Sequence, residues 1–235
     1  MIALRSVVFA CVFYSWSAIM ALAMVPLLLA PGRWMSGAMK IWAHGVIVLL
    51  RSTCDIRVEF RGLNNLPSGP LLIAAKHQCM FDTMGPLVVI DEACYVMKRE
   101  LTWIPFYSWF SAKAKMIVVD RDGQAAALRG LLSKAKERVA EGRQILIFPE
   151  GSRTRPGITV AYQPGVAGLY RTLDLPCVPL ATNSGVHWPA HGFLRKPGTI
   201  VFEFLAPIAP GLTRVAFMAE LTNQVETASR RLLSE

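Results

Sequence analysis

The sequence predicts an α/β fold, in which a single domain with a mixed, largely parallel sheet flanked by helices follows an N-terminal hydrophobic helical membrane anchor. Two observations predict this arrangement. An uncharged apolar segment lies near the start of the chain, and short apolar runs alternate with helical patterns over the remainder. We therefore assign residues 1–54 to a two-helix membrane anchor and residues 55–235 to one globular domain.

The anchor begins with an uncharged segment of 25 residues, Ser6–Ala30. As a helix this segment would be about 38 Å long at 1.5 Å per residue, enough to cross a bilayer with some tilt. A cleaved signal peptide is the competing interpretation, but the segment exceeds a normal signal-peptide apolar region and a second apolar stretch follows. That stretch, residues 41–50, is too short to span and predicts an interfacial or half-inserted helix.

Charges predict the orientation and partners of the anchored domain. Arg33, Lys40 and Arg51 follow the apolar segment and outnumber Arg5 before it, so the positive-inside rule predicts a globular domain in the cytoplasm. The net charge of +9 suits anionic lipid surfaces or phosphorylated substrates. It would also suit nucleic acid, but no zinc-knuckle, RNP-like or basic-zipper pattern is present, so we expect no nucleic-acid partner.

Cysteines and histidines give no metal or disulfide signal. The five cysteines are odd in number and lack a C-x-x-C pair, which indicates neither a disulfide framework nor a zinc site. His187 and His191 flank Pro189, which breaks the helix that would align them. We therefore expect no metal.

The globular domain opens with residues 55–62, which alternate like a half-buried strand. Six short apolar runs then predict buried strands at residues 71–75, 93–99, 115–121, 144–149, 177–182 and 199–204. The clearest helical pattern, residues 123–142, lies between the third and fourth of these runs and ends at a glycine. Strands that alternate with helices favour a largely parallel sheet.

Polar clusters follow five of the predicted strands. In chain order they read KHQCMFDT, KRE, DRD, PEGSRT and NSG. The carboxyl ends of parallel strands meet at one edge of a sheet, so these clusters predict one convergent site.

The first cluster places His77 five residues before Asp82. The two side chains can meet only across a turn, where the aspartate would accept the proton of one ring nitrogen and leave the other nitrogen as a base. No protein nucleophile is evident: Ser152 lacks a G-x-S-x-G setting, and Cys79, a possible thiolate, lies among apolar residues that favour an inert thiol. Such a pair would activate a hydroxyl that arrives with the substrate.

Basic side chains in the other clusters predict an anion site. Arg153 suits a phosphate monoester because its planar group can donate two hydrogen bonds. Glu150 could hold Arg153 or bind a substrate hydroxyl, and a local ion pair that caps a helix is the alternative. Lys98, Arg99 and Arg121 are further candidates for the same anion, although Lys98 and Arg99 equally suit contact with lipid headgroups.

These motifs resemble the glycerolipid acyltransferases of the lysophosphatidic acid acyltransferase type. HQCMFD matches the family's H-x-x-x-x-D signature and FPEGSRT its Pro-Glu-Gly motif. The resemblance extends to KRELTWIPFYSWF, VVDRD and CVPLATNSG, and covers residues 56–204 with the motifs in the family's order.

The resemblance implies transfer of an acyl chain from a thioester, acyl-CoA or acyl carrier protein, to the sn-2 hydroxyl of 1-acylglycerol-3-phosphate, which forms phosphatidic acid. It implies no cofactor, and its partners are the membrane lipid substrate, the acyl donor and the phospholipid bilayer. His77 would be the general base and Asp82 would orient it. The substrate-binding residues would be Lys98, Arg121, Glu150, Gly151, Ser152 and Arg153.

Departures from the family pattern leave the acceptor open. Cys79, Met80 and Phe81 stand where a small polar residue and an aromatic are usual, and Gln163 stands where a lysine is common. The alternative acceptor is another lyso-lipid such as lyso-ornithine lipid. A membrane-tethered lipid-binding protein and a thioesterase are alternatives of other classes. The aromatic residues within 101–110 suit the membrane interface, an acyl-chain groove or a packed helix.

Overall fold

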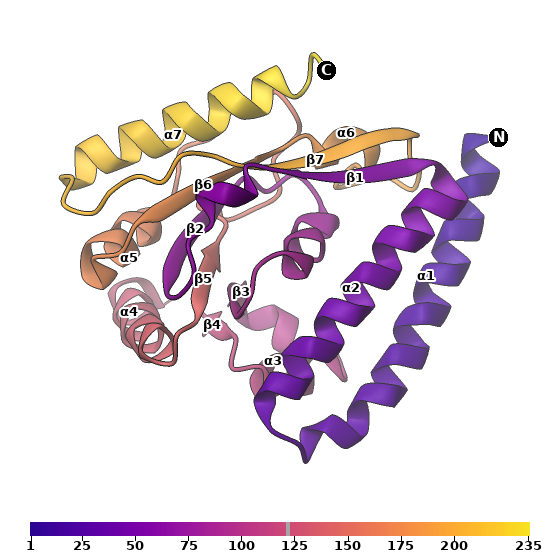
Figure 1. Ribbon diagram of the computed structural model, residues 1–235, viewed down its shortest axis with the longest axis horizontal. Helices are drawn as coiled ribbons and strands as arrows, with labels where there is room; N and C mark the ends of the chain where they lie inside the picture. Colours follow the sequence, from indigo (N-terminus) through magenta and orange to yellow (C-terminus); the bar gives the residue numbers. More distant parts are fainter. Residues whose placement is uncertain (121–122) are drawn as a thin grey trace.

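The computed structural model describes residues 1–120 and 123–235. Its N-terminal part is a helical hairpin of α1 (Ile2–Met24) and α2 (Gly32–Cys54), joined by the 3₁₀ turn η1 (Val25–Leu28). The two helices lie side by side along one flank of the domain (Figure 1). Gly45 makes this approach possible, because a Cβ at that position would lie 2.5 Å from the ring of Trp16.

The second helix is longer than the sequence predicted. α2 covers 23 residues and not only the apolar stretch 41–50. It begins after Pro31 and ends before Asp55, which adopts a left-handed φ of 57°. Its apolar residues recur on one face, which packs on the sheet, so they form no continuous run in the sequence. In the described chain, one helical stretch, Ile2–Leu28, is long and apolar enough to cross a membrane.

The sheet has seven strands in the order β1-β7-β6-β2-β5-β3-β4. Their bounds are β1 Ile56–Arg61, β2 Leu71–Ala75, β3 Ala93–Lys98, β4 Ile117–Val119, β5 Gln144–Ile147, β6 Cys177–Thr182 and β7 Gly198–Phe204. β2 to β6 are mutually parallel, β7 runs antiparallel to β6, and β1 is parallel to β7. The predicted α/β fold with a mixed, largely parallel sheet is confirmed, and β4 is shorter than predicted.

Each face of the sheet is covered by a different set of helices (Figure 1). α4 (Gln124–Ala140), α5 (Gly165–Leu173) and α7 (Arg214–Arg231) cover one face, and the α1–α2 hairpin covers the other. Alternation along β2 shows the division: Leu72 and Ala74 belong to the core under α4, α5 and α7, whereas residues 71, 73 and 75 belong to the core under α2.

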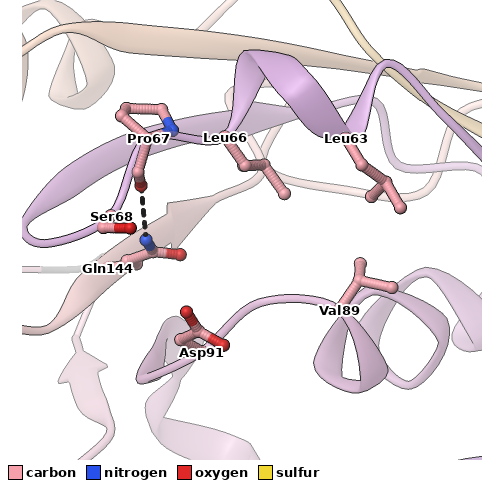
Figure 2. Close-up of a pocket in the computed structure, with 7 residues that line it drawn as sticks. All are labelled: Leu63, Leu66, Pro67, Ser68, Val89, Asp91 and Gln144. Carbon is pink, nitrogen blue, oxygen red and sulfur yellow. Dashed lines mark hydrogen bonds between the residues drawn. The ribbon is translucent and has the colours of Figure 1, made fainter.

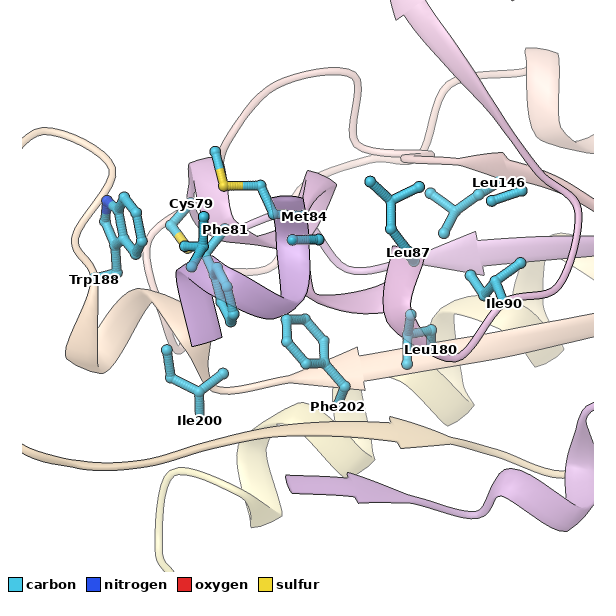
Figure 3. Close-up of a cluster of buried hydrophobic side chains, with 14 of the residues drawn as sticks. Cys79, Phe81, Met84, Leu87, Ile90, Leu146, Leu180, Trp188, Ile200 and Phe202 are labelled. Carbon is cyan, nitrogen blue, oxygen red and sulfur yellow. The ribbon is translucent and has the colours of Figure 1, made fainter. Parts of the chain in front are cut away.

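The chain between β2 and β3 forms two short 3₁₀ helices, η3 (Met80–Thr83) and η4 (Gly85–Val88), which pack on the α2 side of the sheet. Figure 3 shows Phe81 among aromatic neighbours. Its ring centroid lies 5.7 Å from that of Trp188 and 5.8 Å from that of Phe202. This apolar support fixes the segment that carries Asp82.

The aromatic run after β3 is partly packed and partly exposed. It forms η5 (Arg99–Trp103) and α3 (Tyr107–Lys113). Phe110 is buried against the tip of the helical hairpin, with Met24 and Met35, whereas Trp103 and Trp109 are exposed. One side of the run is therefore a packed helix, and the other presents aromatic rings at the surface.

Candidate active site

The carboxyl ends of β2, β5 and β6 lie next to one another, because β2 pairs with both of the other strands. His77 follows β2, Glu150 follows β5 and Ser184 follows β6, at the start of the short helix α6 (Ser184–His187). Hydrogen bonds join these segments around His77 and Asp82. The sheet therefore brings together three of the five polar clusters that the sequence predicted to converge.

His77 and Asp82 meet across the turn that the spacing required. His77 Nδ1 lies 3.1 Å from Asp82 Oδ2. The same carboxylate oxygen accepts the main-chain N–H groups of Gln78 at 2.6 Å and Cys79 at 2.7 Å. Since a carboxylate oxygen accepts hydrogen bonds, Nδ1 is the donor in this contact and Nε2 is the ring nitrogen left for another partner.

The second carboxylate oxygen of Asp82 is also occupied. Its Oδ1 accepts a hydrogen bond from the Ser184 hydroxyl, and the Cys79 thiol lies 3.6 Å away. The Asp82 side chain is 1% exposed, so protein donors take the place of water around the charge. Ser184 belongs to the predicted NSG cluster, but no local pattern predicted its contact with Asp82.

The His77 ring is covered on one face, and its side chain is partly exposed. It stacks on the Phe148 ring with 4.1 Å between centroids and an angle of 24°. The His77 side chain is 13% exposed, in contrast to its aspartate partner. A fixed, partly exposed imidazole with its Nδ1 proton committed to a carboxylate is suited to accept a proton at Nε2.

Glu150 is turned inward and holds the main chain of His77. Its Oε2 accepts the His77 N–H at 2.6 Å, and its Oε1 lies 2.7 Å from Lys76 Nζ. Burial raises the pKa of Glu150, and the Lys76 ammonium opposes this rise. Of the two roles that the sequence left open for Glu150, the structure shows neither the pair with Arg153 nor an exposed carboxylate for a substrate hydroxyl, because Glu150 pairs with Lys76 in the protein interior.

The other predicted binding residues lie at the surface around this edge. Ser152 and Arg153 are exposed in the loop after β5, and Lys98 is exposed at the end of β3. Among the described residues, neither Arg153 nor Lys98 has an ion-pair partner, so both cations face solvent. Gly151 is buried and adopts a φ of 75°, which favours glycine. Arg121 lies outside the described residues.

Cys79 is not an activated nucleophile. It is buried, and desolvation together with the nearby Asp82 charge raises the pKa of its thiol well above the usual value. This burial agrees with the prediction of an inert thiol. In the described part of the chain, no cluster of three or more His, Cys, Asp and Glu side chains is placed to hold a metal ion.

A cavity of about 260 Å³ lies at the opposite end of the sheet. Figure 2 shows its lining by Leu63, Leu66, Pro67, Ser68, Val89, Asp91 and Gln144. Gln144 is the first residue of β5, and its side-chain amide donates to the carbonyl oxygens of Pro67 and Gly69. This cavity is at the amino ends of β2 and β5, whereas His77 follows the carboxyl end of β2.

Comparisons with known proteins identify the family of this chain. The Acyltransferase family model matches residues 57–183. Over 159 residues the chain is 37% identical to a 1-acyl-sn-glycerol-3-phosphate acyltransferase of Pseudomonas aeruginosa, which covers 68% of this chain and 62% of the relative. Over 207 residues it is 26% identical to the mouse 1-acyl-sn-glycerol-3-phosphate acyltransferase alpha, covering 86% of this chain and 72% of the relative.

A solved structure has the same fold. The crystal structure of the 1-acyl-sn-glycerophosphate acyltransferase of Thermotoga maritima superposes with a TM-score of 0.83, covering 100% of this chain and 99% of that one. The sequence identity of the pair is 18%, so this match concerns the fold. The structural match includes the helical hairpin as well as the sheet, since it extends over the whole chain.

Proposed function

Because the chain belongs to the acyltransferase family, we propose that it transfers an acyl chain from an acyl thioester to the sn-2 hydroxyl of 1-acylglycerol-3-phosphate, forming phosphatidic acid. One observation carries the proposal. The His77 ring is oriented by a buried aspartate, and among the described residues that contact this pair the cysteine, Cys79, is fully buried. An acceptor hydroxyl is the group that such a base would activate.

The proposed reaction is a direct attack. His77 Nε2 takes the proton from the acceptor hydroxyl while the oxygen attacks the thioester carbonyl carbon. Asp82 stabilises the imidazolium that forms. When the tetrahedral intermediate collapses, the C–S bond breaks, the ester forms, and the imidazolium returns its proton to the leaving thiolate. Acyl-CoA or acyl carrier protein enters as a substrate, and the scheme uses no cofactor or metal.

The acceptor phosphate is the proposed ligand of the exposed cations. Arg153 lies in the loop that also holds His77 through Glu150, so a phosphate on Arg153 would place the acceptor near the base. Ser152 is exposed beside Arg153 and offers a hydroxyl to the same group. Lys98 and the predicted Arg121 are the further candidates.

We place the site at a membrane surface. The support is the apolar stretch Ile2–Leu28, which would keep the enzyme where its lipid acceptor resides. The basic residues that follow it favour a domain on the cytoplasmic side of a bacterial inner membrane.

The test is thiol release from long-chain acyl-CoA by the detergent-solubilised protein, with and without 1-acylglycerol-3-phosphate. We expect release that needs the acceptor, and a loss of about 10²-fold or more in His77→Ala. His191→Ala, at an exposed histidine outside the site, is the matched control and should retain full activity.

Other outcomes identify the alternatives. Release without acceptor would indicate a thioesterase, and activity with lyso-ornithine lipid alone would change the acceptor. If acyl-CoA and acyl carrier protein donors both fail with both acceptors while the protein still binds lipid, the enzyme proposal is refuted in favour of a lipid-binding protein.

A further inference from the structure

Lys76 directly precedes His77 but points to the opposite side of the sheet. The even-numbered residues of β2, Leu72 and Ala74, face the core under α7. Lys76 continues this alternation beyond the end of β2, and its ammonium reaches Glu226 of α7. His77 lies on the other side, stacked on Phe148. The peptide bond between Lys76 and His77 thus connects the contacts under α7 to the catalytic histidine.

The Lys76 ammonium is the centre of a buried polar network. Its Nζ lies 2.7 Å from Glu150 Oε1, donates to Glu226 Oε1 at 2.7 Å and donates to the Ile158 carbonyl oxygen at 3.2 Å. The two hydrogen bonds use two of the three N–H donors of the ammonium, and the contact with Glu150 is an ion pair. Glu226 also accepts from the Tyr162 hydroxyl and from the Thr159 hydroxyl, each at 2.9 Å.

The network reaches His77 through both main-chain groups of that residue. Glu150 bridges Lys76 and the His77 N–H with its two oxygens. The His77 carbonyl oxygen accepts the N–H of Thr154 at 2.8 Å. Both Glu150 and Thr154 belong to the loop after β5. On the buried side of the same loop, Lys76 donates to the Ile158 carbonyl oxygen, and Glu226 accepts from the Thr159 and Tyr162 hydroxyls.

The buried position of this network argues against a role in substrate binding and against a role in stability alone. The side chains of Lys76 and Glu150 are 1% and 0% exposed, so neither can contact a lipid headgroup. Buried ion pairs give little net stability relative to apolar residues of similar volume, because desolvation of the charges is costly. What the network supplies is a fixed geometry for the loop and for the main chain of His77.

We propose, on the basis of the acyl transfer proposed above, that Lys76, Glu150 and Glu226 are positioning residues that fix the main chain of His77. Glu226 of α7 then controls the rate of the chemical step without touching the substrate. The network acts through the orientation of the imidazole, since a displacement of about 1 Å in a catalytic group is enough to cost on the order of 10²-fold in rate.

The first test is Lys76→Met, which keeps an unbranched side chain and removes the charge. We expect kcat to fall by roughly 10- to 100-fold while KM for 1-acylglycerol-3-phosphate changes by less than about 3-fold. Lys134→Met, at an exposed lysine of α4, is the matched control and should change neither constant. A rise in KM with unchanged kcat would overturn the proposal, because it would identify Lys76 as a substrate-binding residue.

A second pair of variants separates positioning from folding. Lys76→Met leaves two buried carboxylates without their cation and should lower the melting temperature. In Lys76→Met/Glu226→Leu one of these carboxylates is removed, so we expect the melting temperature to recover while kcat stays low. Recovery of kcat together with stability would show a purely structural role and overturn the proposal.

Glu226→Leu alone tests the contribution of α7. We expect kcat to fall by about 10-fold, with the KM of the acceptor again nearly constant. Glu220→Leu, at an exposed position of the same helix, is its control. If the wild type shows no acyl transfer the proposed function itself is refuted, whereas an active wild type with equally active Lys76 and Glu226 variants refutes only the positioning role.

Discussion

Asp82 Oδ2 lies 3.1 Å from His77 Nδ1, and the two residues belong to a single turn that follows β2. The same oxygen accepts two main-chain N–H groups of that turn, from Gln78 and Cys79. The carboxylate therefore organises the turn and orients the histidine at once. A substitution at Asp82 will affect both the turn and the histidine. The size of each effect depends on whether the new side chain keeps oxygen atoms that accept these hydrogen bonds.

Asp82→Asn keeps the size of the side chain and an acceptor oxygen but removes its charge. The imidazolium that forms during proton transfer would lose its buried counterion, so we expect kcat to fall by roughly 10²- to 10⁴-fold. Steady-state rates with saturating acceptor check this. Asp174→Asn is the control, because Asp174 is exposed and has a left-handed φ of 51° that Asn tolerates. A rate close to wild type in Asp82→Asn would contradict the assignment of His77 as base.

Ser184→Ala removes the hydroxyl that donates to Asp82 Oδ1. The loss of a hydrogen bond to a buried charge should lower the free energy of unfolding by about 1.5–3 kcal/mol, with a smaller loss of kcat than Asp82→Asn gives. Ser229→Ala is a matched control, because the Ser229 hydroxyl is buried and no described residue is its partner. Denaturant unfolding of both variants measures the difference, and equal losses would show that the contact with Asp82 contributes nothing.

Much of the fold was predictable because its strands are short apolar runs between polar turns. Each predicted strand is present, and the His77 to Asp82 spacing correctly required a turn. The length of α2 was missed because an amphipathic helix has no continuous apolar run. Helical periodicity around residues 35–50 is the signal that would have extended the predicted second helix toward its N-terminus.

The interior polar contacts of the site were not predictable from local pattern. Lys76 was not singled out, since a lysine beside a turn is usually at the surface. Its partner Glu226 is 150 positions away on a helix with no motif, so only the fold brings them together. The alternation of β2 was the available signal, because it places residue 76 on the face of Leu72 and Ala74.

Cys79→Ser should leave the activity within a few-fold of wild type, because a serine hydroxyl can also donate to Asp82. Burial and the nearby Asp82 charge raise the pKa of the Cys79 thiol, which disfavours the thiolate. We therefore expect the alkaline side of the pH–rate profile to be the same in wild type and Cys79→Ser. A loss of activity in Cys79→Ser, or a change in the alkaline side of its pH–rate profile, would indicate that a thiolate takes part.

Arg153→Ala should raise KM for 1-acylglycerol-3-phosphate by 10-fold or more, because a charged hydrogen bond to phosphate contributes about 1.5–3 kcal/mol. Arg153→Lys should restore the affinity only in part, since an ammonium cannot form the two-pronged contact. Arg171→Ala, at an exposed arginine of α5, is the control. An unchanged KM for the phosphate acceptor in Arg153→Ala would remove Arg153 from the proposed anion site and favour an acceptor without a free phosphate.

Two buried tyrosines provide a test of how hydroxyl groups contribute to the stability of this domain. The Tyr95 hydroxyl is buried without a hydrogen-bond partner among the described residues, and burial raises its pKa well above the usual value. The Tyr170 hydroxyl donates to the Ala209 carbonyl oxygen and accepts the Leu212 N–H at 3.1 Å. Tyr95→Phe should leave the free energy of unfolding unchanged or raise it, whereas Tyr170→Phe should lower it by roughly 1–3 kcal/mol. Denaturant unfolding in the same detergent compares the two, and an equal loss in Tyr95→Phe would mean that its hydroxyl has a partner in solution.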